Sequence, residues 1–210
     1  MSALLLFELI AEVGFPPGSV QLLLGAGPMV GQPLAVSHRV DKIAFTGGTA
    51  TGRKIMQAAT GNLKKVTLEL GGKSPNIIFE DADLDVALDF ALFGIFAGQG
   101  EVCSAGSRLL LQRSLADRFL PRLGEAARKI VVGDGMHPDT EMGPLISPAH
   151  MERVLSYIEL GRQERAQLLC GGERLITTGL SNGNFVAPTI FVNTEPTMRI
   201  VQVQNSASRD

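Results

Sequence analysis

Cysteine and histidine are scarce in this 210-residue sequence, and their scarcity limits the kinds of site that it can build. The two cysteines, Cys103 and Cys170, are too few for a disulfide framework and show no CxxC spacing that would indicate zinc. The three histidines, His38, His137 and His150, are scattered among polar and turn residues. We therefore expect structural or solvated roles for the histidines, and no metal site.

The sequence also lacks an excess of positive charge and any long apolar run. Its formal net charge is −2, which argues against nucleic acid as a partner. Glu8, Glu12 and Asp89 interrupt the longest apolar stretches, so none approaches the roughly 18 residues that span a bilayer. The first residues have no basic region and no clear cleavage site. These absences predict a cytoplasmic protein with neither a membrane nor a nucleic acid as partner.

Apolar residues make up 45% of the chain, enough for the core of one large or two small domains. Segments that fit strands alternate with segments that fit helices, and this alternation predicts an α/β fold with a parallel, doubly wound sheet. Ligands of such sheets bind beyond the carboxyl ends of the strands. In chain order the expected elements are helix 4–13, strand 20–24, helix 28–38, strand 42–45, helix 50–59, strands 66–70 and 76–79, helix 81–98, a helix to about 128, a helix from 147, and strands 167–172 and 185–191.

Two local patterns in the second half of the chain carry more specific predictions. Ser114 and Asp117 have the spacing of a capping box, which would begin the helix that runs to about residue 128. Phe90, Phe93 and Phe96 fall in the expected helix 81–98, and we interpret them as core residues rather than as part of a cofactor pocket.

Neither glycine-rich turn in the first half is a complete nucleotide-binding fingerprint. The spacing from Gly25 to Gly31 is one residue too long for GxGxxG, and the stretch 52–54 does not make a phosphate loop. As patterns alone, these glycines fit ordinary tight turns better than they fit cofactor binding.

Two stretches point to covalent catalysis. Strand 66–70 delivers the carboxylate of Glu69 to a glycine pair, and further along the chain Cys103 stands in a run of small residues. A thiol attacks an electrophilic carbon as the thiolate, and a carboxylate nearby can accept a proton from the thiol or from water. Cys170 lies in an apolar strand without such a motif, so we expect it to be buried and inert.

The two motifs, LELGGKSP at 68–75 and GQGEVCSAGSR at 98–108, resemble those of the aldehyde dehydrogenase superfamily, in the same order. The resemblance extends from about Leu4 to Val201. It implies the C-terminal half of a Rossmann-like cofactor domain at residues 1–71, followed by most of an α/β catalytic domain, which carries the thiol, at 72–201. Residues 202–210 are expected to form a polar, disordered tail.

The resemblance implies NAD or NADP as cofactor. In the family, the turn and helix start that match Gly47, Gly48, Thr49 and Gly52 lie beside the dinucleotide pyrophosphate, as a helix N-terminus favours. Leu70 is expected to contact the cofactor as well. Gly48 stands where the family usually has serine, so one hydroxyl contact to phosphate is missing here.

The resemblance also implies the reaction, which is oxidation of an aldehyde to a carboxylic acid. Cys103 is the expected nucleophile, its backbone N–H is a candidate donor to the oxyanion, and a nicotinamide accepts the hydride. Glu69 is the expected general base that activates water to hydrolyse the thioester, which favours hydrolysis over transfer to coenzyme A. The identity of the aldehyde stays open.

Family members are longer, so the chain resembles an internal fragment of one. The portions without a counterpart would supply an Asn of the oxyanion hole, a ribose-binding Lys, a ribose-binding Glu and the strand used for oligomerisation. A homo-oligomer of the family type would therefore lack that segment. Two alternatives follow: an inactive or regulatory fragment that binds full-length subunits, or a cysteine hydrolase in which a histidine lies beside Cys103.

Overall fold

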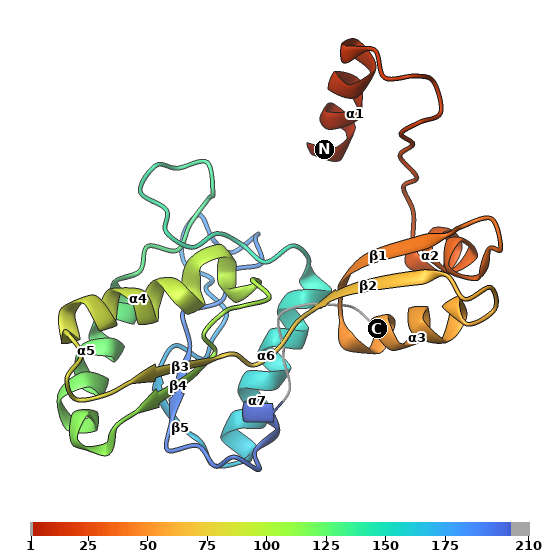
Figure 1. Ribbon diagram of the computed structural model, residues 1–210. Coiled ribbons are helices and arrows are strands. Elements are labelled where there is room, and N and C mark those ends of the chain that lie inside the picture. Colours follow the sequence, from red (N-terminus) through yellow and green to blue (C-terminus); the bar gives the residue numbers. More distant parts are fainter. Residues whose placement is uncertain (1, 203–210) are drawn as a thin grey trace. The chain divides into compact units, whose positions relative to one another are not determined.

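The computed structural model describes residues 2–202 of the chain (Figure 1). Within them the chain forms two compact units. One holds residues 2–46 and 50–68, and the other holds residues 47–49 and 69–202. In the part of the chain that is described, no helix is both long enough and apolar enough to cross a membrane.

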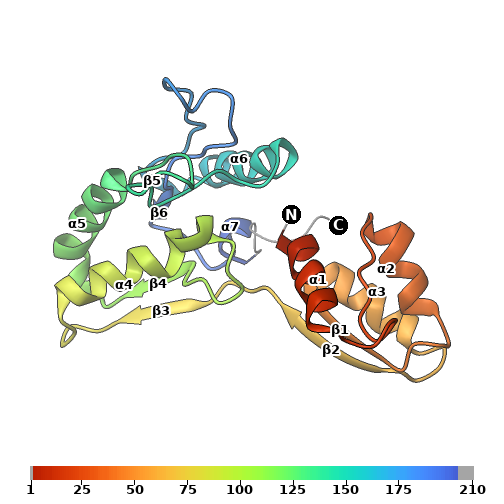
Figure 2. The same ribbon diagram turned by 90° about the horizontal axis from the view of Figure 1, so that it is seen from above.

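The first unit is built around a strand–helix–strand arrangement. Strand β1 (Lys42–Gly47) leads into helix α3 (Thr49–Ala59), which returns to strand β2 (Lys65–Leu70). The N–H of Lys65 donates to the carbonyl of Asp41 at 3.0 Å, so β1 and β2 begin side by side and run parallel. Figures 1 and 2 show the two strands adjacent, with α3 along them. The predicted strands and crossover helix are thereby confirmed.

Two further helices precede β1. Helix α1 (Ser2–Val13) ends at Gly14, whose φ of 85° turns the chain out of the helix, and none of its residues is buried. Helix α2 (Gly27–Val36) has Pro28 in its first turn, as predicted. The Lys64 ammonium, buried just before β2, donates to the last carbonyls of α2 and of the turn after it. A cation at a helix C-terminus is favourable, so Lys64 fixes α2 to the start of β2.

The prediction of a buried strand at 20–24 is wrong. This segment has no regular secondary structure, and its apolar side chains are exposed, Leu23 by 59% and Leu24 by 63%. A strand is stabilised by hydrogen bonds to a neighbouring strand, and among the described residues β1 pairs only with β2. Residues 20–24 therefore have no neighbouring strand to pair with, and their strand propensity alone does not form a strand.

The second unit begins with a parallel strand pair. Strand β3 (Pro75–Ile78) pairs in parallel with strand β4 (Arg108–Leu111), with Asn76 opposite Leu109. Helix α4 (Leu84–Phe96) connects the two strands and packs against helix α5 (Ala116–Lys129). The core between these elements consists of buried apolar side chains: Ile78, Ala91, Leu115, Phe119 and Leu123. β4 was not expected from the sequence, because its apolar run follows the cysteine motif without a turn signal.

Of the three phenylalanines predicted to be core residues of α4, only Phe96 is buried. Phe90 and Phe93 are exposed by 67% and 70%. The helix buries its other face, which carries small and branched residues such as Ala87 and Ala91, against α5 and β3. Residues 90 and 93 lie on the opposite side of the helix, so the prediction was wrong for both.

The helix starts differ in how they are capped. Asp83 caps α4, since its carboxylate accepts from the N–H groups of Asp85 and Val86. The capping box predicted for α5 is wrong. A short 3-10 helix, η2 (Arg113–Leu115), leads directly into α5, and the hydroxyl of Ser114 donates to Glu80 instead. The capping residue, Leu115, has no side-chain hydrogen bond to the helix.

The rest of the second unit packs around helix α6 (Pro148–Gln163), capped by Ser147 as predicted. Strand β5 (Gln167–Cys170) pairs antiparallel with β6 (Ile190–Val192), which is shorter than the strand predicted at 185–191. Helix α7 (Arg199–Gln202) places Gln202, expected to begin a disordered tail, in a helix, and residues 203–210 lie outside the described part of the chain. Within that part the sheets are the pairs β1–β2, β3–β4 and β5–β6.

Candidate functional site

Glu69 is the next-to-last residue of β2. Exposed and half-buried residues alternate along this strand, and Glu69 shares the exposed side with Lys65 and Thr67. Its carboxylate makes no hydrogen bond and no ion pair with any described residue. A carboxylate in this position is therefore free to accept a proton from a bound molecule.

Cys103 lies in a tight turn that presents its thiol to solvent. The N–H of Ala105 donates to the carbonyl of Val102 at 3.0 Å, so Cys103 and Ser104 are the central residues of the turn. The Cys103 residue is exposed. In the described part of the chain its backbone N–H has no acceptor, which leaves that donor available to a developing oxyanion.

Three consecutive residues with left-handed backbone angles bring the chain to this turn. Gly98, Gln99 and Gly100 follow α4 in the 3-10 segment η1 (Ala97–Gly100), with φ values of 59°, 57° and 74°. This conformation costs a non-glycine residue such as Gln99 about 1 kcal/mol. A Cβ at Gly100 would lie 3.0 Å from the carbonyl oxygen of Ile95, so glycine is required there for space as well.

The chain after Cys103 is fixed by backbone hydrogen bonds. The N–H of Gly106 donates to Gly94 in α4 at 2.9 Å, and the N–H of Arg108 donates to Ser74 at 3.1 Å. A Cβ at Gly106 would lie 3.2 Å from the Asn76 side chain, which shows how closely the loop approaches β3. The segment after the cysteine is thus held against the segment that continues from Glu69.

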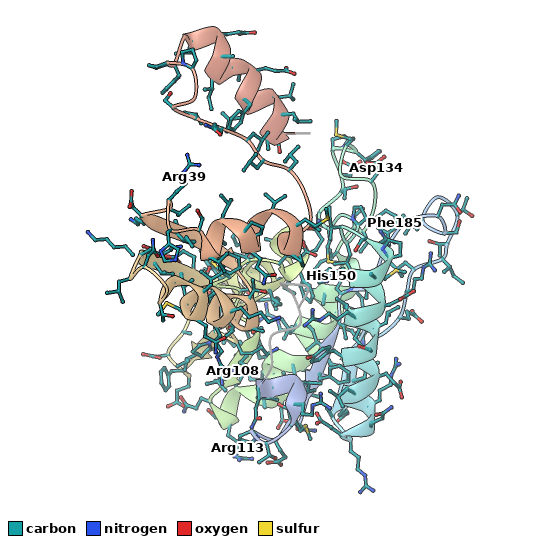
Figure 3. All side chains as sticks on the ribbon, turned by 90° about the vertical axis from the view of Figure 1, so that its right-hand side faces the viewer. Arg39, Arg108, Arg113, Asp134, His150 and Phe185 are labelled. Carbon is teal, nitrogen blue, oxygen red and sulfur yellow. The ribbon has the colours of Figure 1, made fainter. Side chains whose placement is uncertain are left out.

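A cavity of about 810 Å³ lies in the second unit beside this loop. It is lined by Lys73, Glu101 and Arg108 from the two motifs and by His150 from α6, and Figure 3 labels Arg108 and His150. Burial lowers the pKa of Lys73, and the positive charge of Arg108 lowers it further. Neither Glu69 nor Cys103 lines this cavity, so it is adjacent to the predicted chemistry rather than its location.

The structure does not join the two predicted catalytic side chains directly. No hydrogen bond or ion pair among the described residues links Glu69 to Cys103, and none links any histidine to Cys103. His137 lies 3.9 Å from Asp139 on an exposed loop, and His150 contacts Glu101. A cysteine hydrolase, which needs an imidazole at the thiol, gains no support from these contacts.

The predicted cofactor-binding glycines lie where β1 ends and α3 begins. Gly47 is the last residue of β1, Gly48 is buried, and Thr49 is the exposed first residue of α3, while Gly52 is buried in that helix. The first turn of α3 contains no acidic residue. A helix N-terminus with small residues and no carboxylate of its own has the chemistry to bind a phosphate.

Leu70 is the half-buried last residue of β2, next to Glu69. The turn at 47–49, the end of β2 and Cys103 all belong to the second compact unit, whereas Gly52 belongs to the first. Among the described residues no group of three or more side chains from His, Cys, Asp and Glu could hold a metal ion.

The sequence predicted no role in the site for Gln99, Glu101 or His150. In the structure Glu101 contacts His150, and Gln99 reaches Gly143, both beside the Cys103 loop. A structural or solvated role was expected for His150, and its side chain, only 12% exposed, fits the structural one. No motif links residues as far apart as 101 and 150. The position of His150 near the start of a predicted helix was the only available signal.

Cys170 has the opposite surroundings from Cys103. It is 5% exposed, as predicted, and its Sγ lies 3.6 Å from the carbonyl oxygen of Pro188. Burial raises the pKa of this thiol.

Comparison with known proteins gives a consistent result. Residues 1–204 match the aldehyde dehydrogenase family. A betaine aldehyde dehydrogenase of Bacillus subtilis (strain 168) is 52% identical over 202 residues, which cover 96% of this chain and 41% of that protein. An aldehyde dehydrogenase of Davidiella tassiana is 46% identical over 203 residues, with 96% and 40% covered. The chain therefore spans about two fifths of the length of these relatives, as its resemblance to an internal part of longer family members predicts.

Solved structures of aldehyde dehydrogenases are similar to this chain as well. A putative aldehyde dehydrogenase from Burkholderia cenocepacia superposes with a TM-score of 0.95 at 48% identity, covering 98% of this chain and 42% of that one. A Staphylococcus aureus betaine aldehyde dehydrogenase variant in complex with NAD+ also gives 0.95, at 45% identity, with 98% and 41% covered. The predicted fold class, a Rossmann-like part followed by an α/β catalytic part, is confirmed.

Proposed function

Because the chain belongs to the aldehyde dehydrogenase family, we propose that its residues carry out NAD(P)-dependent oxidation of an aldehyde to a carboxylic acid, with Cys103 as nucleophile and Glu69 as general base. The observation that carries this proposal is the exposed thiol of Cys103 in a backbone-fixed turn, in the same compact unit as the Glu69 carboxylate, which has no partner among residues 2–202.

The first step uses the thiol. The thiolate of Cys103 attacks the aldehyde carbon, a C–S bond forms, and the carbonyl electrons move onto oxygen. The backbone N–H of Cys103, which has no acceptor among the described residues, donates to that oxyanion. Fixed backbone at Gly98–Gly100 and at Gly106 keeps this donor in place before the substrate arrives.

The second step removes a hydride from the same carbon. As the oxyanion collapses to a carbonyl, the carbon releases its hydride and becomes the carbon of a thioester on Cys103. A bound nicotinamide supplies the hydride acceptor, which no side chain can provide.

The third step is hydrolysis. The carboxylate of Glu69 takes a proton from a water molecule, and the resulting hydroxide attacks the thioester carbon. The C–S bond breaks, Cys103 leaves as thiolate and the carboxylic acid is released. General-base catalysis of this kind contributes about 10²- to 10⁴-fold.

The residues at the start of α3 fit a dinucleotide phosphate. Gly47 and Gly48 allow close approach, Thr49 offers a hydroxyl, and the first turn of α3 has no carboxylate to repel an anion. We propose a partial cofactor-binding domain at residues 1–71, which contains Gly52 and Leu70 and ends just after the base Glu69, and a catalytic domain at residues 72–201. The NAD+ found in similar solved structures supports NAD as the first cofactor to test.

The test measures whether the chain reduces NAD or NADP when an aldehyde is added. The absorbance of the reduced nicotinamide monitors the reaction. The aldehyde panel should include betaine aldehyde, because similar proteins are named for it. Cys103→Ala is expected to abolish turnover. Glu69→Gln is expected to leave a single stoichiometric burst of hydride transfer and to slow the following steps at least 100-fold.

Cys170→Ala is the matched control, since it removes the other thiol of the chain and should leave turnover unchanged. Turnover that survives Cys103→Ala contradicts the proposal. So does a Glu69→Gln variant with the parent's steady-state rate, because another group would then have to activate the water.

A second candidate is that the chain binds longer subunits of the family without turning over substrate. The exposed apolar side chains of the second unit favour it, among them Phe79, Phe90 and Phe93, each more than 60% exposed. Co-elution with a full-length family member, lost on Phe90→Ser and Phe93→Ser, together with no cofactor reduction by the parent chain, would support this candidate over the first.

A further inference from the structure

We infer that Glu101 and His150 are positioning residues for Cys103, and that together with Gln99 and Gly143 they clamp the cysteine loop to the segment that begins α6. This inference deepens the proposed function and rests on it for the role of Cys103. The clamp itself stands on contacts within the second unit.

The first contact joins two polar side chains across the loop. Nε2 of His150 lies 3.0 Å from Oε1 of Glu101, and the two side chains are 12% and 32% exposed. Among the described residues Nε2 has no hydrogen-bond partner, so the two atoms are in close contact without the alignment of a hydrogen bond. The His150 side chain is thus almost fully removed from solvent where it meets the loop.

The imidazole is held by the start of α6. His150 belongs to the first turn of that helix, where its own N–H is capped by the hydroxyl of Ser147 at 3.2 Å. The side chain that contacts Glu101 is therefore carried by the capped start of a 16-residue helix.

The second contact comes from Gln99. When its side-chain amide is oriented so that both of its polar atoms are satisfied, Oε1 accepts from the N–H of Gly143 and Nε2 donates to Gly98, both at 2.9 Å. A Cβ at Gly143 would approach the Gln99 amide to 2.8 Å, so a side chain there would displace this amide from its present position. Two side chains of the loop thus reach the single segment 143–150.

These contacts explain how a loop with unfavourable backbone angles can hold one conformation. Gln99 and the two glycines beside it have left-handed angles, which are stable only where surrounding contacts determine them. Glu101 stands two residues before Cys103, so the clamp fixes the approach to the turn, while backbone bonds of Gly106 and Arg108 fix its exit. Displacement of a nucleophile by about 1 Å can cost about 100-fold in rate.

Amide hydrogen exchange with single-residue resolution tests the clamp without any requirement for activity. The N–H groups of residue 101, bonded to Gly98, and of Ala105, bonded to Val102, report on the loop. In Glu101→Gln and in His150→Gln we expect both to exchange on the order of tenfold faster. The double variant should be no faster than either single one, because the two side chains act as a pair.

Two controls separate positioning from general loss of structure. His150→Arg places a side chain rich in hydrogen-bond donors opposite Glu101, and it should return both exchange rates to within about threefold of the parent. His137→Gln removes the imidazole of the exposed His137–Asp139 pair, and it should change neither rate. Where the chain is active, His150→Gln should lower kcat about tenfold at unchanged KM for the nucleotide.

Unchanged exchange at residues 101 and 105 in His150→Gln overturns the inference. So does faster exchange that spreads evenly over the second unit, or that His150→Arg fails to reverse. If aldehyde oxidation survives Cys103→Ala while the two rates still rise in His150→Gln, the clamp is supported and the proposed function alone fails.

Discussion

The two cysteines of this chain are chemically identical, and the second unit gives them opposite surroundings. Cys103 stands in an exposed turn, on a loop tied down before and after it. Cys170 ends β5, buried between α5 and β6, with its sulfur against the carbonyl of Pro188. We expect reactivity at one site and inertness at the other, and the difference would come from the backbone around each thiol, since both side chains are the same.

Glycines with left-handed angles accompany both cysteines, but they serve different purposes. Gly98 and Gly100 precede Cys103 and lift the chain out of α4 so that the thiol faces solvent. Gly171 follows Cys170 and brings the chain against the backbone of Pro188, which closes the space over the sulfur. The comparison therefore predicts differences in reactivity, in the cost of substitution and in the dependence of stability on pH.

The largest expected effect is on thiol reactivity. With iodoacetamide under native conditions, Cys103 should be alkylated on the order of 1,000-fold faster than Cys170, because the buried thiol reacts only after local opening of β5. Peptide mapping by mass spectrometry measures both rates in one sample. Equal rates in the native chain, or faster labelling of Cys170, would break the comparison, and equal rates in denaturant serve as the control.

The next effect is on stability. In Gly171→Ala the new Cβ would lie 2.1 Å from the carbonyl oxygen of Pro188, at a φ of 70°, so backbone must move and we expect a loss of about 3 kcal/mol or more. In Gly98→Ala the nearest atom is a flexible Val102 methyl at 3.6 Å, so only the left-handed angle costs free energy, about 1 kcal/mol.

Urea unfolding of both variants and the parent measures these two losses in free energy of unfolding. If Gly98→Ala proves the more costly of the two, then the loop of Cys103, and not the region of Cys170, is the tightly packed one.

The sequence predicted both sides of this comparison. The exposure of Cys103 and the burial of Cys170 follow from local composition, small residues around one and a strand pattern around the other. Most helices and strands were also predictable, because apolar periodicity and Pro28, Asp83 and Ser147 mark their positions. Prediction failed at 20–24, where a strand pattern has no strand to pair with, and at Phe90 and Phe93, where the buried face of α4 is decided by what packs on it.

The clamp on the Cys103 loop was beyond sequence reasoning for the same reason. Glu101 and His150 are joined only by the folding of α6 beside the loop, and no spacing in the chain marks such a pair. The left-handed angle of Gln99 is equally invisible, since glutamine is not a residue that favours it. Local patterns identify the chemistry of a site, whereas the contacts that hold it depend on tertiary structure.

The smallest expected effect concerns pH, and its sign follows from burial. Burial raises the pKa of Cys170 in the folded chain above its ordinary value of 9.0. Below pH 9.0 the thiol is neutral in both the folded and the unfolded chain, so its ionisation costs no stability. As pH rises through 9.0 towards the higher folded pKa, the unfolded chain ionises first, and the free energy of unfolding falls. The free energy of unfolding of the parent should decline more steeply between about pH 8 and pH 10 than that of Cys170→Ala.

Lys73 is expected to change stability with pH in the opposite direction over an overlapping pH range. It is therefore the matched comparison for Cys170. Burial, with a contribution from Arg108, lowers its folded pKa below 10.5, so the folded chain bears the cost of a buried charge until the ammonium loses its proton. That cost disappears as pH rises through the folded pKa towards 10.5, so Lys73 makes the free energy of unfolding rise over this range. Lys73→Met should abolish this rise, whereas Cys170→Ala should abolish the fall that the buried thiol causes. Urea unfolding at several pH values for the three chains measures both slopes. Parallel curves for the parent and Cys170→Ala would mean that the buried thiol ionises as readily as a free one, and the contrast between the two cysteines would then be one of access alone.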